Sequence, residues 1–191
     1  MIPVPATIDA DVESWARDRA EPLRSVHGLD EQRISVIVAA LVVAHRLAAR
    51  GRGQFFLLFD PLSKLVAPFH VVISEGELAP TAQRNFLLPT APRPPELRLT
   101  SETAFGVGCS STLLTTRPGT AEIRWLFVAT GMTLAATLAP VATVATMSMG
   151  ITAEDLLGAL SVEGGRLGRS AVFEPEALIA ETRDAQEEWA L

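Results

Sequence analysis

The sequence predicts an α+β fold, a two-layer sandwich in which a mainly antiparallel sheet carries a central buried helix on one face. Residues Glu31 to Arg50 form one long segment whose centre is apolar on every side, as in helices buried on several sides. From Gln54 onward, runs of β-branched and aromatic residues alternate with proline and glycine turns, which is typical of strands. A curled sheet or barrel with flanking helices is the alternative that these patterns leave open.

The whole chain, residues 1–191, is the right length for one domain and short for two. Hydrophobic residues make up 48% of the chain and charged residues 20%, which leaves enough apolar material for a core. Four prolines fall within residues 89–95, where they fix the backbone and disfavour a helix. We therefore expect an extended crossing at 89–95 within a single α+β domain.

The first helix is expected near the amino terminus. Thr7 or Asp9 can cap it, Val12 and Trp15 lie on its apolar side, and Pro22 is expected to fray its end. The sequence predicts further helices at residues 31–50, 81–88, 153–162 and about 175–189. The last of these is an acidic helix with a proline at its first position.

Six strands are expected in the middle of the chain. They lie at residues 55–59, 69–74, 97–103, 105–116, 122–130 and 133–138. Turns at 117–120 and at Gly131 separate the last three strands. Gly106 and Gly108 inside an apolar run indicate a bulge or a close approach of the backbone.

One stretch carries no charge at all, the 29 positions from Trp125 to Ala153. It is long enough to cross a bilayer. Its many threonines favour strands, however, and Gly131 and Pro140 would interrupt a helix. A strand hairpin in a water-soluble sheet is therefore the favoured interpretation, with Val141 to Met149 as one more strand or an extended loop.

The charge pattern argues against nucleic acid as a partner. The net charge is −6, and the first 120 residues hold twelve acidic and twelve basic residues, so the acidic excess lies late in the chain. A nucleic-acid-binding protein normally shows a basic stripe that neutralises phosphates, and none is visible here.

Cysteine usage indicates a reducing compartment. The single cysteine, Cys109, cannot form an internal disulfide, and no Cys/His cluster suggests a structural zinc site. The segment Met1 to Pro5 lacks the features of a secretory signal. We expect a cytoplasmic protein, and the preference for arginine over lysine is typical of GC-rich bacterial coding DNA.

No motif with a recognisable chemistry stands out, so we predict no catalytic residue, no cofactor and no metal. The remaining candidates are expected to be structural. They are the histidines (His27, His45 and His70), Cys109, the glycine-rich segments (Gly51–Gly53 and 164–170) and the acidic pairs (Glu75/Glu77 and Glu154/Asp155). In particular, no histidine pair has a metal-ligand spacing on a helix, and no second residue identifies Cys109 as a nucleophile.

The leading functional hypothesis is a non-catalytic interaction, assembly or chaperone-like accessory protein that binds another protein or itself. Trp189 on the acidic helix, and Trp125, are the candidate partner-binding anchors, because tryptophan is enriched at binding hot spots. The alternative is a small cofactor-free enzyme or a binding protein for an apolar molecule. Its pocket would be lined by four phenylalanines, Phe55, Phe69, Phe105 and Phe127. A membrane-associated protein is the third hypothesis.

Overall fold

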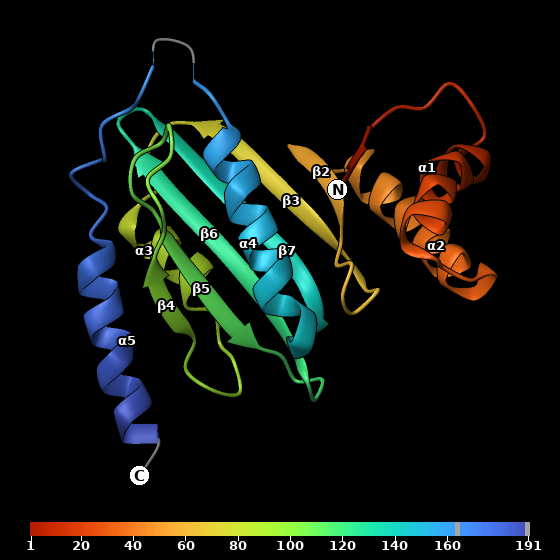
Figure 1. Ribbon diagram of the computed structural model, residues 1–191. Coiled ribbons are helices and arrows are strands. Elements are labelled where there is room, and N and C mark those ends of the chain that lie inside the picture. Colours follow the sequence, from red (N-terminus) through yellow and green to blue (C-terminus); the bar gives the residue numbers. More distant parts are fainter. Residues whose placement is uncertain (163–164, 190–191) are drawn as a thin grey trace.

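A computed structural model, which describes residues 1–162 and 165–189, shows an open seven-stranded antiparallel sheet with five helices (Figure 1). The strand order across the sheet is β1-β2-β3-β7-β6-β5-β4. The strands are β1 (Ile2–Val4), β2 (Gln54–Phe59), β3 (Val66–Glu75), β4 (Glu96–Leu99), β5 (Cys109–Leu114), β6 (Thr120–Ala129) and β7 (Met132–Ala142). The α+β prediction is confirmed, and the sheet is not closed into a barrel.

The helices cover the two faces of the sheet unequally. They are α1 (Val12–His27), α2 (Glu31–Ala48), α3 (Pro80–Leu87), α4 (Thr143–Ala159) and α5 (Pro175–Trp189). Alternate residues of β6 show the division. Trp125 and Phe127 pack in the cluster under α4, whereas Leu126 packs with α3 and α5 on the opposite face. Helix α4 therefore covers one face of β6 and β7, and α3 and α5 cover the other face near β4 to β6 (Figure 1).

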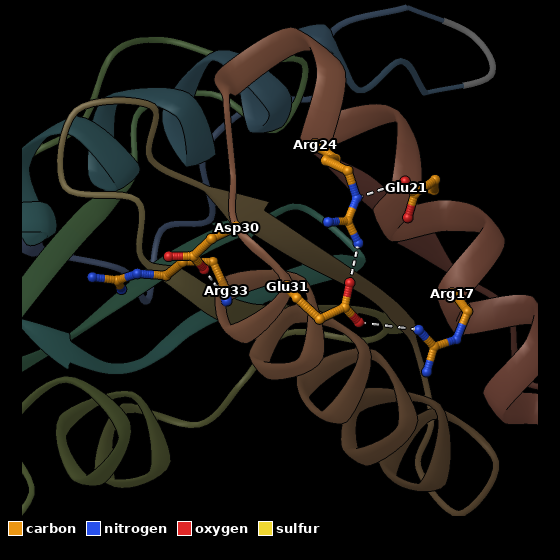
Figure 2. A network of polar contacts seen from close by, with 6 residues as sticks. All are labelled: Arg17, Glu21, Arg24, Asp30, Glu31 and Arg33. Atoms are coloured by element: carbon orange, nitrogen blue, oxygen red, sulfur yellow. Dashed lines mark hydrogen bonds and ion pairs between the residues drawn. The ribbon is translucent and has the colours of Figure 1, made fainter.

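Helices α1 and α2 form a hairpin at the β1–β2 end of the sheet. Asp11 and Asp30 cap them by accepting hydrogen bonds from backbone N–H groups three residues later, at 2.8 Å in each case. Arg24 contacts Glu21 at 2.6 Å and Glu31 at 2.5 Å, which ties the end of α1 to the start of α2 (Figure 2). These charged groups lie at the surface, so the network orients the hairpin more than it stabilises the fold.

The expected start and end of α1 are wrong. Asp11 is the N-cap rather than Thr7 or Asp9, and the helix runs through Pro22 to His27. Packing explains the continuation, since Ala16 and Ala20 are fully buried against the hairpin and the chain turns only at Gly28. Gly28 has φ of 61°, and its N–H donates to the Arg24 carbonyl, so glycine supplies the stop that proline was expected to give.

Helix α2 is buried on one side rather than on several. Ile34, Ile37 and Leu41 pack with strands β1 and β2 in a cluster of their own. On the outer side, Val36 and Val43 are each about half exposed. The apolar sequence of α2 therefore includes side chains that remain exposed to solvent.

The charge-free stretch divides into sheet and helix. Its first part is the expected β6–β7 hairpin, which turns at Gly131 with φ of 76°. The expectation of a strand or loop at Val141–Met149 is wrong, because α4 begins at Thr143, ten residues before the helix predicted at 153–162. No helix in the described ranges is long and apolar enough to span a bilayer.

The remaining elements follow the sequence closely. Strands β2 and β3 pair as an antiparallel hairpin. Helix α3 matches the helix expected at 81–88, with each end shifted by one residue, and the crossing at 89–95 contains no helix. Strands β4 and β5 are shorter than predicted, because residues 100–108 form a loop. Strand β1 was not predicted, and it adds to the sheet by pairing with β2.

Candidate functional site

Trp125, one of the two predicted anchors, is fully buried. Its indole Nε1 donates a hydrogen bond of 3.1 Å to Glu154 Oε1 on α4, and its ring meets Phe69 edge to face at 5.7 Å. It therefore acts first as a core residue that joins α4 to the sheet. The side chain of Trp189, the other predicted anchor, lies outside the described residues.

The four phenylalanines of the predicted pocket do not converge. Phe69, Phe105 and Phe127 belong to the cluster beneath α4 and are almost fully buried. Phe55 lies in the separate cluster with α2, where its ring stacks on His70 at 4.0 Å. All four pack as core side chains.

The histidines make contacts of structural kinds. His45 Nδ1 lies 2.9 Å from the Pro5 carbonyl oxygen, and His70 Nε2 lies 2.6 Å from that of Arg52. His27 packs against Phe59, with ring centroids 4.8 Å apart. Within the part of the chain that the structure describes, no group of three or more His, Cys, Asp or Glu residues is placed to hold a metal ion.

Cys109 is inaccessible in the folded protein. Its side chain is fully buried, and this burial raises the pKa of the thiol to about 12. The nearby negative charge of Glu176 acts in the same direction, and a backbone hydrogen bond with Arg98 opposes it. A buried neutral thiol is a poor nucleophile, which agrees with a packing role.

Glu77, from one of the acidic pairs, and two arginines of the glycine-rich loop are also engaged by their surroundings. Glu77 accepts hydrogen bonds from the Ser170 hydroxyl at 2.5 Å and from the Gly131 N–H at 3.3 Å. In the loop, Arg166 pairs with Glu102 at 2.7 Å, and Arg169 pairs with Glu176 at 2.8 Å. Both arginines are thus already opposed by carboxylates.

A groove lies between α4 and the half of the sheet that α4 leaves uncovered, and we call it the α4 groove. Its volume is about 330 Å³. Its lining comes from β4, β5, β6 and about the first three turns of α4: Glu96, Arg98, Ser110, Thr112, Leu114, Ala121, Ile123, Trp125, Thr143, Thr146, Met147, Gly150, Ile151 and Glu154. The helix crosses β6 and β7, so the same face of β4 and β5 forms the open side (Figure 1).

Close contact between α4 and the sheet shapes this groove. A Cβ atom at Gly150 would lie 3.0 Å from Ile123 Cδ1, so glycine allows the helix to sit close to β6. Ala145, Met149 and Ala153 then fill the buried side of the helix at intervals of four residues. This close seating fixes the position of the groove wall.

The outer edge of α4 is an exposed apolar ridge, which we call the α4 ridge. Its three side chains, Val144, Met147 and Ile151, are 78%, 77% and 58% exposed. Their spacing of three and four residues places them along one side of the helix. Leu114, which is 40% exposed, lies across the groove on β5. These four side chains form an exposed apolar surface beside the groove, and apolar surface of this kind on a monomer often marks a binding site.

The charged groups in the groove already have hydrogen-bond partners. Arg98 donates to Glu96 Oε1 through Nε at 3.0 Å and through a terminal nitrogen at 2.6 Å. Glu154 accepts from Trp125. A second hollow of about 270 Å³ shares Glu96, Thr112 and Leu114 with the groove and extends it toward Arg93 and Gln186. The site is therefore an extended, nearly neutral surface.

Sequence reasoning did not identify this site. The signal was present in part, because residues 144, 147 and 151 share one side of a helix within the charge-free stretch. It was missed because that segment was interpreted as extended chain.

Comparisons of this chain with protein-family models, with curated proteins and with solved structures find no match.

Proposed function

We propose that this protein is a non-catalytic interaction module that binds a partner protein in the α4 groove. The observation that carries the proposal is the α4 ridge, a row of exposed apolar side chains along an open groove. Exposing such a patch is unfavourable in water, and a protein partner that covers it regains the hydrophobic free energy.

The chemistry of the groove favours binding over catalysis. Its lining contains no histidine or cysteine, and its carboxylates are held by Arg98 and by the Trp125 indole. The hydroxyls of Ser110 and Thr112 instead offer hydrogen bonds to a bound chain, which suits the polar part of a protein interface. As part of this proposal we place the protein in the cytoplasm, because its one cysteine is a free thiol.

An apolar small molecule is the second candidate occupant. The observation in its favour is the groove volume of about 330 Å³, which lies at the lower end of the range for ligand pockets. The groove is open along its length, however, and a small apolar ligand gains most when a pocket surrounds it. We therefore rank this candidate below a protein partner.

Selection from a random peptide library displayed on phage tests the proposal. Immobilised protein is expected to enrich peptides with several apolar residues. The variants Met147→Glu and Ile151→Glu, which place a charge on the ridge, are expected to weaken peptide binding by about 100-fold. The matched control is Leu62→Glu, which alters an 88% exposed apolar residue in the β2–β3 turn and is expected to bind normally.

Failure to enrich any peptide that depends on Met147 and Ile151 would contradict the proposal. Native mass spectrometry of the purified protein tests the small-molecule candidate. A retained apolar molecule that is lost in Met147→Glu, without peptide enrichment, would favour the small-molecule candidate instead.

A further inference from the structure

Glu154 is a charged group of the α4 groove that has no counterion in the part of the chain that the structure describes. Its Oε1 accepts a hydrogen bond of 3.1 Å from the Trp125 indole, which is a neutral donor. None of the ion pairs among the described residues includes Glu154. Arg98, which also lines the groove, pairs with Glu96 at 2.6 Å. The groove therefore keeps one negative charge that its own residues do not match.

Glu154 lies on the same side of α4 as part of the ridge. Met147, Ile151 and Glu154 follow one another at intervals of four and three residues, and all three line the groove. Seven residues of helix separate Met147 from Glu154, which corresponds to about 10 Å along the axis. The Glu154 side chain is partly buried already, so a chain that covers the ridge along its length also displaces water from the carboxylate.

We propose that the partner segment bound in the α4 groove carries a lysine or arginine that pairs with Glu154, about 10 Å from the apolar side chain that covers Met147. This inference rests on the proposed function and specifies the chemistry of its partner. Removal of water from a carboxylate is unfavourable unless a counterion takes its place. Since the groove does not supply that counterion, the partner supplies it.

Arg98 is held away from Glu154 by the sheet. Arg98, Ser110 and Trp125 are paired in one row across β4, β5 and β6. Neighbouring strands lie about 4.8 Å apart, so the Arg98 backbone is about 10 Å from that of the tryptophan that Glu154 contacts. The guanidinium donates instead to Glu96 on its own strand. The middle of the row is Ser110, which lines the groove and whose hydroxyl can accept a hydrogen bond from a basic group placed beside Glu154.

The charges around Glu154 also favour a cationic partner. Asp155 follows it with an exposed side chain. The last turn of α4 contains no basic residue to oppose the negative end of the helix dipole. The whole chain carries a net charge of −6. These charges act in the same direction, so they attract a basic segment and repel an acidic one.

Two random peptide libraries that differ only in whether they encode lysine and arginine test the inference on the unmodified protein. Peptides that depend on Met147 and Ile151 are expected to be enriched about 10-fold more from the complete library, and to carry a basic residue at a constant distance from their apolar residues. Replacement of that basic residue by glutamine in a synthetic peptide is expected to raise the dissociation constant about 10-fold. Fluorescence anisotropy measures the change, and this comparison needs no variant of the protein.

A double-mutant cycle assigns the effect to Glu154. Glu154→Gln keeps an oxygen that accepts from the Trp125 indole but removes the charge. It is expected to raise the dissociation constant of the basic peptide about 10-fold and to leave that of the glutamine peptide unchanged. The matched control is Asp155→Asn, which removes an equal charge from a side chain outside the groove lining and is expected to change binding by less than about 2-fold. Circular dichroism confirms that both variants are folded.

Three results would overturn the inference and leave the proposed function standing. One is equal enrichment of ridge-dependent peptides from both libraries. Another is a Glu154→Gln variant that binds the basic peptide as tightly as the unmodified protein does. The third is equal weakening by Glu154→Gln and Asp155→Asn, which would show that the overall negative field attracts the peptide without a contact at Glu154. Absence of ridge-dependent peptides from both libraries would refute the proposed function and this inference with it.

Discussion

Asp60 shows how one buried carboxylate organises a turn. It follows β2 and is almost fully buried. Its side chain accepts hydrogen bonds from the N–H groups of Leu62 at 3.4 Å and Ser63 at 2.9 Å, and from the Ser63 hydroxyl. Its backbone also pairs with Leu65 and Lys64 at 2.9 Å. The carboxylate therefore holds the tight connection through which β2 and β3 pair.

The pKa of Asp60 leads to a prediction about acid stability. Burial is the largest single influence and acts to raise the pKa, but the hydrogen bonds, led by those from Ser63, together hold it below its usual value. A depressed folded pKa means that the stabilisation is present above the unfolded pKa and is lost as the pH falls through the folded pKa. Asp60→Ala is expected to lower the free energy of unfolding by about 1–3 kcal/mol at pH 7 and by much less at pH 3.

Urea denaturation at the two pH values measures this difference. Asp60→Asn is the matched variant, because its amide oxygen still accepts hydrogen bonds but does not titrate. It is expected to lose less stability than Asp60→Ala at pH 7. An equal loss for Asp60→Ala at pH 7 and at pH 3 would show that the ionised carboxylate does not support the turn.

Gly108 and Gly158 differ in whether packing requires a residue without a side chain. Gly108 precedes β5, where a Cβ would lie 2.5 Å from the Phe127 ring and 2.7 Å from the Leu126 carbonyl oxygen. Gly158 lies near the end of α4, and a Cβ there would meet nothing within 4 Å. Gly108 is thus required by the close approach of β5 and β6, whereas Gly158 is not required by packing.

The substitution of each glycine by alanine is therefore expected to have opposite effects. Gly108→Ala should destabilise the protein by about 2–3 kcal/mol, because neither the backbone of β6 nor the buried Phe127 ring can move freely. Gly158→Ala should stabilise it by about 0.5 kcal/mol, because alanine restricts the unfolded chain and favours the helix. Thermal and urea unfolding of both variants measures the pair, and a stable Gly108→Ala protein would contradict the packing at β5.

The elements that the sequence predicts well are those with local signals. The Asp30 cap, the proline turns around β2 and β3 and the Gly131 turn each specify their neighbours directly. Helix α4 lacks such a signal, since it has no side-chain N-cap and its threonines and valines favour strands. What makes it helical is the burial of Ala145 and Met149 against the sheet, and such tertiary packing overrides local propensity.

The site was harder to predict than the fold for the same reason. The α4 groove is built from β4, β5, β6 and α4, which come together only when the strand order of the sheet is known. Trp125 could be picked out as unusual from the sequence, but whether its ring was exposed or buried depended on α4 lying above it. Periodicity reports the apolar side of a helix, and it cannot report which apolar residues a neighbouring element will cover.

The molecule as a whole divides its core into separate clusters, with consequences for local stability. Helices α1 and α2 share one cluster with β1 and β2, whereas β6 and β7 contribute to the cluster under α4. Strand β6 is covered on both faces, so that residues Trp125 to Ala129 are all buried. Helix α1, in contrast, buries only Ala16 and Ala20 fully. The hairpin end of the sheet is therefore expected to open more easily than the centre.

Hydrogen exchange tests this division. Amides of α1 are expected to exchange on the order of 100-fold faster than those of β6, because local opening of the hairpin leaves the central strands paired. Trp15→Ala, which removes a partly buried ring between the two helices, should accelerate exchange in α1 and α2 and leave β6 unchanged. Equal protection of α1 and β6, or a Trp15→Ala effect that spreads to β6, would instead show that the two ends of the sheet unfold as one unit.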